Sequence, residues 1–426
     1  MKKTIVPQDQ TYWYLQRPQA QPLRESLEVD VVIVGGGMAG ISAAQAFIKK
    51  NKKVVLLEAY YCGAGASGKS SGFITPNSEI SLSTFIKRHG QEGGKAIWNV
   101  IESGVDYIRD NITKFNLTCD YSPEDSLYVA NSLGTCKAIQ EEYKNLQESG
   151  YATEYISKEK LISLVGSHDY YAGVIYPGTF GINAYKYCQQ MKNILSEQGV
   201  AFYEETPVLS IQDHEVTTAH ARVKAEYVIV CTDRFTPQFG AITKEIYHMQ
   251  NFVLASQVLS NDELKQIFPT KNFMVWDTDL LYSFFRISSN RLILGGGSLW
   301  HLYDRKEKYH NSWVYNKLTN YFRRKFPQLD LQFEQFWPGM IGVSKDIAPL
   351  CGPDKDNKSI YYVAAAAGLP VAAALGNYCA DHLIDKRDDL KDFFSPYRKF
   401  PINNFMQTFL GTKLSFALSH VIEEGF

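Results

Sequence analysis

Three glycines and one acidic residue near the start of the chain have the types and spacing that dinucleotide binding requires. Gly35, Gly37 and Gly40 fit the pattern G-x-G-x-x-G. Glu58 follows Gly40 by about 18 residues, close to the roughly 20 expected for an acid that binds the ribose 2′-OH. The glycines allow a tight turn, close approach to a pyrophosphate and close packing of a helix on its strand. The residues expected at the dinucleotide are Gly35, Gly37, Met38, Ala39, Gly40, Glu58 and Ala59.

A second loop, Gly63 to Gly72, consists almost entirely of small residues and reads GAGASGKSSG. Its glycines and serines offer backbone N–H groups and hydroxyls without bulk, which suits a long ligand that carries phosphates. A protein that binds a nicotinamide dinucleotide has no need of a second such loop directly downstream of the first. The loop residues expected at the ligand are Ser67, Gly68, Lys69, Ser70 and Ser71.

A third motif, Gly368-Leu369-Pro370, opens a predicted helix that continues through Gly376 to Ile384. The first turn of a helix leaves N–H groups unpaired and carries the positive end of the helix dipole. We therefore expect Gly368, Leu369 and Pro370 to face an acceptor atom of the ligand.

The elements that must position these motifs follow from the hydrophobic pattern. Val31 to Val34 is a β-branched run typical of a parallel strand buried on both faces, and a helix is predicted after it at 41–50. Residues 79–150 are predicted to be mostly helical around a short strand at 127–130, with Glu141 to Lys144 on a solvated face. Further strands are predicted at 54–57, 199–202, 207–208, 225–233, 252–258, 281–286, 291–294 and 360–363, and further helices at 184–198 and 311–326.

Chain length and composition limit the number of domains and the classes of ligand. A chain of 426 residues is too long for one compact core and suits two domains. The net charge of −1 provides no basic surface for nucleic acid, and the nine histidines do not have metal-ligand spacing. Seven scattered cysteines, with no apolar leader and no run of about 18 apolar residues, favour a reducing cytoplasm and no membrane span.

The glycine motif, Glu58 and the GAGASGKSSG loop together resemble the FAD-dependent superfamily of D-amino-acid oxidase, sarcosine oxidase and glycine oxidase. The early Tyr12-Trp13 and the Trp337-Pro338 pair are similar to its γ-glutamylputrescine-oxidase-like branch. The resemblance implies bound FAD, with the backbone of Val208 at the adenine and the start of the helix at Gly368 facing the flavin N1/C2=O edge. It also aligns Ala225 to Asp233 with the second cofactor strand. That strand usually ends Ala-Thr-Gly or Ala-Gly-Ala, whereas this chain has Cys-Thr-Asp and keeps Thr232.

The same resemblance implies the fold class and the domains. The class is α/β, a Rossmann-like FAD-binding domain of the glutathione-reductase type interleaved with an antiparallel-sheet substrate domain. The discontinuous FAD-binding domain is assigned 29–90, 152–235 and 338–400, and the substrate domain 91–151 and 236–337. Residues 1–28 form an N-terminal arm whose Tyr12, Trp13 and Tyr14 pack on the body of the protein.

Residues 401–426 are assigned an amphipathic helix. Its apolar stripe consists of Phe405, Phe409, Leu410, Leu414, Leu418 and Val421. Packing of this stripe on the body is the favoured interpretation, and contact with a membrane or a second subunit is the alternative.

The implied reaction is oxidation of the C–N bond of an amine or amino acid to an imine by hydride transfer to flavin N5, followed by hydrolysis. The candidate catalytic residues are Tyr282, Arg286 and Trp337. Arg286 is either a clamp for a substrate carboxylate or a structural cation, and Trp337-Pro338 stands where amino-acid oxidases usually have arginine. The absence of that arginine favours an amine that is anchored elsewhere.

Two properties of the flavin follow from departures from the family. Ile293 occupies the position of a lysine that promotes reaction with O2 in sarcosine-oxidase relatives, so O2 and another electron acceptor both stay open. Neither Pro338 nor Gly339 is the cysteine that binds flavin covalently in those relatives, and the Gly63 to Gly72 loop has no histidine. We therefore expect non-covalent FAD. The alternatives are a dehydrogenase of the same fold that passes electrons to a quinone or other carrier, and a flavin-binding protein without catalysis that docks a membrane or partner.

Overall fold

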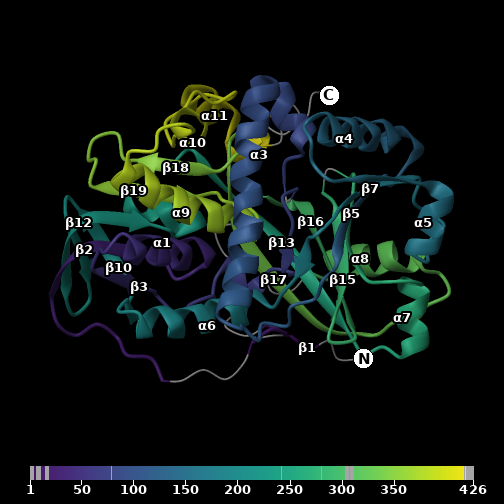
Figure 1. Ribbon diagram of the computed structural model, residues 1–426, viewed down its shortest axis with the longest axis horizontal. Coiled ribbons are helices and arrows are strands. Elements are labelled where there is room, and N and C mark those ends of the chain that lie inside the picture. The colour runs from purple at the N-terminus through teal and green to yellow at the C-terminus, as the bar shows by residue number, and fades with distance from the viewer. Residues whose placement is uncertain are drawn as a thin grey trace.

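A computed structural model of the chain describes residues 4–5, 11–14, 19–77, 79–240, 242–279, 281–302, 307, 311–416 and 418. Two large sheets lie on either side of the long helix α3 (Leu82–Lys114), as Figure 1 shows. Both sheets are built from segments that are far apart in the sequence.

The sheet that carries the glycine turn has the order β10-β11-β12-β2-β3-β9, and β19 joins it by pairing with both β12 and β18. The central strands β12, β2 and β3 are parallel, and Val31 to Val34 of β2 are buried between them. This confirms the buried parallel strand expected from the β-branched run. The strands are β2 (Leu27–Val34), β3 (Val54–Leu57), β9 (Ala201–Tyr203), β10 (Val208–Gln212), β11 (Glu215–Thr218), β12 (Arg222–Val230), β18 (Leu350–Pro353) and β19 (Ile360–Ala364).

Helices α1 (Met38–Lys49) and α9 (Leu369–Asp385) pack against each other and against α3 at points where only glycine fits. A Cβ on Gly376 of α9 would lie 2.4 Å from the carbonyl oxygen of Ala39, and a Cβ on Gly104 of α3 would lie 2.0 Å from that of Pro370. These backbone contacts fix the start of α9 relative to the glycine turn. The other helix of this half is α6 (Ala184–Glu197), with Asn183 as its N-cap.

The second sheet has nine strands in the order β1-β17-β13-β16-β15-β14-β5-β7-β6. Most of its neighbours are antiparallel, as expected for the substrate domain, but β1 on β17 and β5 on β14 are parallel. Its strands are β1 (Thr4–Ile5), β5 (Asp125–Val129), β6 (Glu154–Ser157), β7 (Ala172–Tyr176), β13 (Ile246–Ser256), β14 (Phe273–Asp277), β15 (Ser283–Ser288), β16 (Arg291–Leu302) and β17 (Phe333–Ser344).

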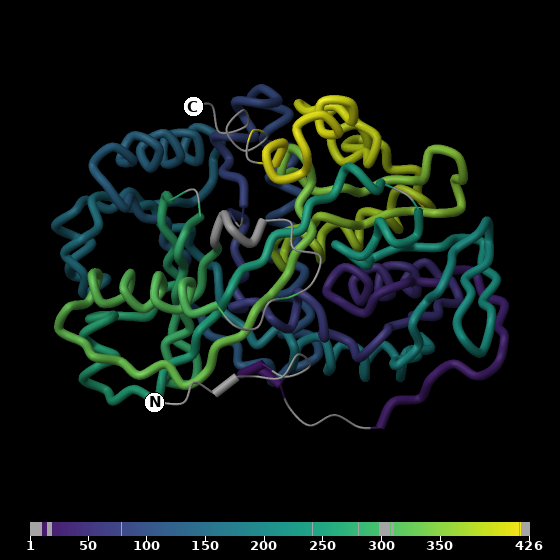
Figure 2. Tube along the Cα trace, turned by 180° about the vertical axis from the view of Figure 1, so that it is seen from behind, coloured from purple at the N-terminus to yellow at the C-terminus, as the bar shows by residue number. Residues whose placement is uncertain are grey.

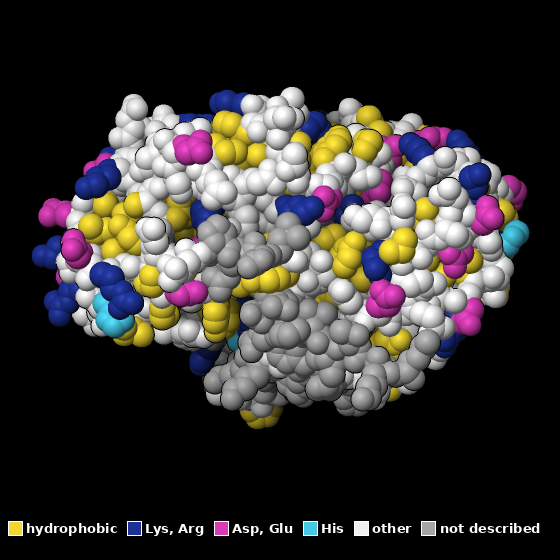
Figure 3. Space-filling view, turned by 90° about the horizontal axis from the view of Figure 1, so that it is seen from below, with side chains coloured by type: hydrophobic (Ala, Val, Ile, Leu, Met, Phe, Trp, Pro, Cys, Tyr) yellow, Lys and Arg dark blue, Asp and Glu magenta, His cyan; other side chains and the backbone are white. Residues whose placement is uncertain are grey.

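Short helices surround this sheet, and Figure 2 shows the same two halves from behind. The remaining elements are β4 (Phe73–Ile74), β8 (Phe180–Gly181), α2 (Ala66–Lys69), α4 (Cys136–Glu148), α5 (Lys158–Leu164), α7 (Asn261–Ile267), α8 (Ser312–Lys325), α10 (Lys391–Phe394), α11 (Asn404–Leu410), η1 (Leu133–Thr135) and η2 (Asp233–Phe239). Outside the grey atoms, acidic and basic side chains are interspersed on the face shown in Figure 3.

The pairing of strands moves two of the predicted domain boundaries. β6 and β7 lie within the span 152–235 that was assigned to the FAD-binding domain, yet they pair with β5 in the nine-stranded sheet. β17 continues to Ser344 in the same sheet, beyond the predicted boundary at 337. Hydrogen-bonding partners decide sheet membership, and a strand pattern in the sequence does not name its partner.

The C-terminal stripe differs from the favoured interpretation. Phe405 and Phe409 are 81 % and 85 % exposed, and Leu414 is 52 % exposed. Gly411, with φ +75°, follows the end of α11, so the segment is not one continuous helix. Phe416 packs on the body instead, with its ring 5.0 Å from that of Tyr247. Val421 lies outside the described residues.

Glu142 also differs from its predicted place on a solvated face. Its carboxylate is buried and accepts hydrogen bonds from the N–H groups of Leu82 and Ser83 and from the Tyr176 hydroxyl. It therefore caps the N-terminus of α3 from another helix.

We predict that Gly104→Ala lowers the thermal unfolding midpoint of the FAD-bound protein. The new methyl group would meet the backbone of Pro370, which cannot rotate away, and such overpacking costs about 1–3 kcal/mol. Gly134→Ala is the matched control, because a Cβ there meets nothing closer than 3.8 Å. Equal midpoints for the two variants would contradict the close packing of α3 on α9.

Candidate flavin and substrate site

The turn between β2 and α1 depends on two of its glycines. Gly35 has φ +106°, and a Cβ there would lie 2.4 Å from the carbonyl oxygen of Cys231 on the neighbouring strand. A Cβ on Gly40 would lie 1.9 Å from the carbonyl oxygen of Gly35. The first turn of α1, with Met38 and Ala39, is thereby held close to the end of β2.

Glu58 stands beside this turn, at the end of β3. Its carboxylate accepts hydrogen bonds from the N–H of Gly36 at 2.7 Å and of Tyr60 at 2.9 Å. Burial raises the pKa of Glu58, and the backbone N–H groups oppose that rise. Ala59 follows it on the surface, and the N–H of Thr206 bonds to the Glu58 carbonyl, which brings the segment leading to Val208 alongside.

Two hydrogen bonds join the two glycine loops, and in one of them the N–H of Gly63 donates to the carbonyl of Gly36 at 2.9 Å. The N–H of Met38, in the first turn of α1, donates to the Ser67 hydroxyl of α2 at 3.0 Å. A Cβ on Gly37 would meet only that hydroxyl, at 3.2 Å. The predicted pyrophosphate turn and the predicted flavin loop therefore form one continuous backbone surface.

Two tryptophan side chains donate hydrogen bonds to backbone carbonyls of the second loop. The Trp337 indole donates to the carbonyl of Lys69 at 3.0 Å, and the Trp13 indole donates to the carbonyl of Ser70 at 2.8 Å. Their rings meet edge to face with centroids 6.4 Å apart. Trp13 is buried, so the N-terminal arm packs on the body as expected. Trp337 does not line the cavity described below, and its contacts indicate a positioning residue rather than a catalytic one.

Asp233 stands where the second cofactor strand of the family usually ends in glycine or alanine, and its contacts explain this difference. Asp233 follows Thr232 with φ +48°, a left-handed conformation that favours glycine but is tolerated by aspartate. Its carboxylate accepts hydrogen bonds from the N–H of Gly342 in β17 at 2.7 Å and from the N–H of Ala365 at 3.0 Å. Asp233 thus connects the two sheets beside the start of α9, a role that a glycine could not supply.

The start of α9 is shaped for contact with a ligand. Gly368 is the N-cap with φ +98°, and Leu369 and Pro370 form the first turn. Gly368 and Leu369 line the cavity, whereas Pro370 is buried against α3.

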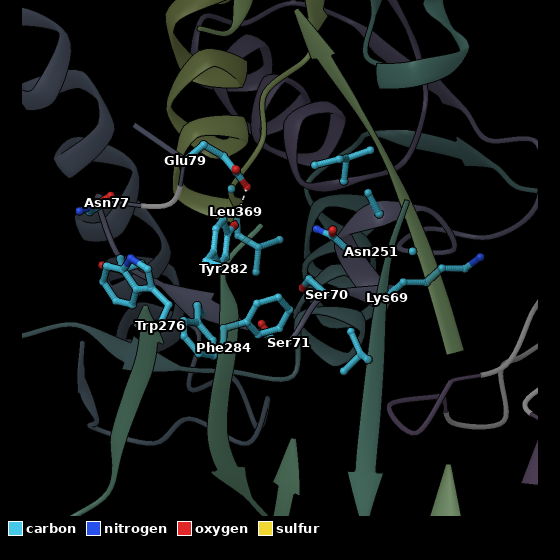
Figure 4. Close-up of a pocket in the computed structure, with 17 residues that line it drawn as sticks. Lys69, Ser70, Ser71, Asn77, Glu79, Asn251, Trp276, Tyr282, Phe284 and Leu369 are labelled. Carbon is cyan, nitrogen blue, oxygen red and sulfur yellow. Dashed lines mark hydrogen bonds between the residues drawn. The ribbon is translucent and has the colours of Figure 1, made fainter. Parts of the chain in front are cut away.

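A cavity of about 140 Å³ lies where the second loop, the start of α9 and the nine-stranded sheet meet. Figure 4 shows its lining side chains. Its lining residues are Ala66, Lys69, Ser70, Ser71, Phe73, Thr75, Asn77, Glu79, Asn251, Val253, Trp276, Tyr282, Phe284, Gly339, Ile341, Gly368 and Leu369. The loop residues predicted to run beside the flavin ring therefore line the same space as the predicted substrate residue Tyr282.

Glu79 is the lining residue that the sequence did not reveal. Its carboxylate accepts a hydrogen bond from the Tyr282 hydroxyl at 2.9 Å, which Figure 4 marks. Burial raises the pKa of Glu79 to about 7, against the lowering effect of that bond. The only signal in the sequence is a carboxylate shortly after the second loop, in a stretch that otherwise predicts a helix.

Arg286 lies outside this cavity, beneath the second loop. Its guanidinium donates to the Glu124 carboxylate at 3.2 Å and to the carbonyls of Ser71 and Ile182, each at 3.1 Å. The side chain is fully buried. These contacts favour the structural alternative, in which Arg286 holds the loop, over a clamp for a substrate carboxylate.

The fold and the joined loops define a protein that holds a dinucleotide between a Rossmann-like half and a second, largely antiparallel sheet. A family model described as FAD dependent oxidoreductase (DAO) matches residues 30–382. The chain belongs to this DAO family of FAD-dependent oxidoreductases. The cavity suits the flavin end of the cofactor, because two backbone segments predicted to contact FAD, Lys69 to Ser71 and Gly368-Leu369, border one space.

Curated relatives agree with this assignment. The chain is 26 % identical to a probable oxidoreductase, OrdL, of Haemophilus influenzae, covering 83 % of this chain and 82 % of that protein. It is also 26 % identical to gamma-glutamylputrescine oxidoreductase of Escherichia coli, covering 81 % of each chain. These matches support an FAD-dependent oxidase or dehydrogenase.

Solved structures confirm the fold. Glycine oxidase of Geobacillus kaustophilus superposes with a TM-score of 0.74 at 17 % identity, covering 88 % of this chain and all of that one. L-proline dehydrogenase of P. horikoshii gives the same TM-score and identity, covering 88 % and 98 %. Within the described part of the chain, no helix has both the length and the apolar character needed to cross a membrane.

We predict that Trp337→Phe weakens FAD binding about tenfold. The change removes one indole donor and leaves the buried carbonyl of Lys69 without it, a loss of about 1–3 kcal/mol. Titration of the apoprotein with FAD, followed by flavin fluorescence, measures the effect. Trp313→Phe is the control, because Trp313 is 54 % exposed on α8. An unchanged dissociation constant in the first variant would show that the loop does not depend on this bond.

Proposed function

We propose that the protein oxidises the C–N bond of an amine to an imine, which water then hydrolyses. The observation that carries the proposal is the composition of the cavity. Its lining combines backbone of the flavin loop and of the α9 start with aromatic side chains and a single carboxylate, Glu79.

The residues that would hold FAD follow from the geometry. The glycine turn, Glu58 and the strand start at Val208 would hold the adenosine end, and Ser67 with the first turn of α1 would hold the pyrophosphate. Lys69 to Ser71, Gly339 and the Gly368-Leu369 turn would border the flavin ring. When bound, FAD accepts two electrons and a hydride from the carbon next to nitrogen. The protein orients the substrate over the ring and keeps water away with its aromatic side chains.

The charges in the cavity favour an amine over an α-amino acid. Among the lining residues only Lys69 and Glu79 are charged. The Lys69 ammonium is 2.6 Å from the Glu307 carboxylate, and its side chain extends away from Glu79 (Figure 4). A substrate carboxylate would meet no unpaired cation among these residues and would be repelled by Glu79. The relative named gamma-glutamylputrescine oxidoreductase, whose name contains the diamine putrescine, supports an alkylamine as the group that is oxidised.

The proposed enzyme is either an oxidase or a dehydrogenase, depending on whether O2 or another acceptor takes the electrons from the reduced flavin. Ile293 is buried in β16, and it offers no cation for reaction with O2 at the position where sarcosine-oxidase relatives have lysine. This favours a dehydrogenase that passes electrons to a quinone or another carrier, while an oxidase is the second form. A third candidate, a flavin protein that docks a membrane without catalysis, is favoured only by the exposed Phe405 and Phe409.

The proposed location is the cytoplasm, since all seven cysteines are free thiols and six of them are buried. Among the described residues, no group of three His, Cys, Asp or Glu side chains could hold a metal ion. The proposed chemistry needs FAD, an electron acceptor that re-oxidises the flavin, and water that hydrolyses the imine.

We expect amines to reduce the flavin and α-amino acids of similar size to fail. Anaerobic titration of the holoenzyme with both panels, followed by loss of the flavin absorbance, measures this. Reduction by amino acids alone would contradict the choice of an amine. Reduction by no candidate at all would favour the protein without catalysis, which liposome sedimentation then tests.

Air or an artificial dye, added to the reduced enzyme, identifies the acceptor. Peroxide formation at a rate that matches turnover supports the oxidase, whereas fast dye reduction without peroxide supports the dehydrogenase. Because Ile293 replaces the lysine, we expect Ile293→Lys to increase the rate of reaction with O2, and Ile293→Leu is the matched control.

We also expect FAD to be released when the protein is denatured by acid or heat, because none of the seven cysteines lines the cavity. Filtration after denaturation separates free flavin from protein. Yellow colour that stays with the protein would show a covalent bond.

A further inference from the structure

Three aromatic rings from three different strands form one wall of the cavity, which we call the aromatic wall: Phe73 of β4, Trp276 of β14 and Phe284 of β15. The ring centroid of Phe73 lies 6.5 Å from that of Trp276 and 5.8 Å from that of Phe284. The Phe284 ring in turn lies 5.9 Å from the ring of Tyr282. The wall thus continues directly to the residue that holds Glu79.

Glu79 differs from two other carboxylates that lie close to the second loop, Glu124 and Glu307. Glu124 faces Arg286, and Glu307 faces Lys69. Glu79 has the Tyr282 hydroxyl as its partner and no Lys, Arg or His within ion-pair distance in the described part of the chain. It is only partly buried, so its carboxylate is accessible from the cavity.

We propose that Glu79 and the aromatic wall form a cation site, which binds the ammonium group with which the substrate enters the cavity. This inference rests on the proposed function in one respect: it takes the bound cation to be the amine that is oxidised. It names the feature of the substrate that is recognised, a positive charge next to an apolar group, and it assigns Glu79 as the residue that determines specificity.

Two physical effects act together at such a site. A carboxylate in a partly desolvated cavity attracts a cation more strongly than it would in water. The faces of aromatic rings attract a cation that lies within about 6 Å of the ring centroid, and this attraction is stronger where water is excluded. A neutral group of the same shape gains only the contact with the rings.

Tyr282 positions the carboxylate and sets its charge. Its hydroxyl donates to Glu79, so it favours the ionised form. No other titratable group faces Glu79 from the described elements around it: the start of α9 contributes Leu369, and the ammonium of Lys69 is paired with Glu307. Above a pH of about 7 the carboxylate is ionised and the site attracts cations; below it, this attraction is lost.

The test uses a cation that cannot be oxidised. tert-Butylamine is protonated from about pH 6 to pH 9, as alkylamines are, and it has no hydrogen on the carbon next to nitrogen. tert-Butanol is its neutral counterpart of nearly the same shape. Binding of each to the FAD-loaded enzyme is measured by the change in flavin absorbance and by calorimetry, which do not depend on turnover.

We expect the wild-type enzyme to bind tert-butylamine about tenfold more tightly than tert-butanol at pH 8.5. This preference should fall as the pH is lowered through about 7. Equal binding of the two compounds at pH 8.5, or a preference that does not change with pH, would overturn the proposal without the use of any variant.

Substitutions test whether Glu79 is the carboxylate that causes the preference for the cation. Glu79→Gln should abolish both the preference and its pH dependence, and tert-butanol binding should stay within about twofold. Tyr282→Phe should keep the preference but move its midpoint to higher pH, because the bond that lowers the pKa of Glu79 is lost. Glu102→Gln is the matched control: burial also raises the pKa of Glu102, but this residue lines a different cavity. A preference that survives in Glu79→Gln refutes the assignment.

The outcomes separate this inference from the proposed function. Flavin reduction by amines together with an unchanged Glu79→Gln variant would reject the cation site and leave amine oxidation standing. A cation preference that requires Glu79, with no amine able to reduce the flavin, would confirm the site and reject the oxidation.

Discussion

The arrangement of the whole site depends on backbone approaching backbone without intervening side chains. Gly40 brings the first turn of α1 against Gly35, and Gly376 brings α9 against Ala39 of the same helix. These contacts, together with the hydrogen bond from Met38 to Ser67, place two helix starts and the second glycine loop at one surface. Unpaired N–H groups at helix starts favour anionic or acceptor atoms, so this surface suits the phosphates and the flavin ring of FAD.

The polar groups that support the second glycine loop are largely paired with one another. Two indoles hold the carbonyls of Lys69 and Ser70, and the Arg286 guanidinium holds the carbonyl of Ser71. The buried carboxylates of Glu124 and Glu307 each face a cation. Glu79 faces only a hydroxyl in the described structure, and it opens to a cavity with aromatic walls.

The sequence predicted the cofactor half well because its signals are local. The buried strand, the glycine spacing and Glu58 depend on a few adjacent residues, and the structure confirms the strand and the joined loops. Sheet membership was less predictable, because β6, β7 and the end of β17 find partners far away in the sequence. Asp233 shows a similar limit: the sequence marked it as a departure, and only the structure shows its bonds to Gly342 and Ala365.

The sequence by itself determined the fold class, the FAD cofactor and the two glycine loops, since the conformational demands of phosphate-binding turns restrict residue types within short segments. Tertiary structure alone decided which charged groups line the cavity. The sequence offered Arg286 as a candidate and did not reveal Glu79, yet long-range packing pairs Arg286 with Glu124 and leaves Glu79 beside Tyr282 in the cavity. Charge pairing acts through space over a few ångströms, and the order of residues along the chain does not specify it.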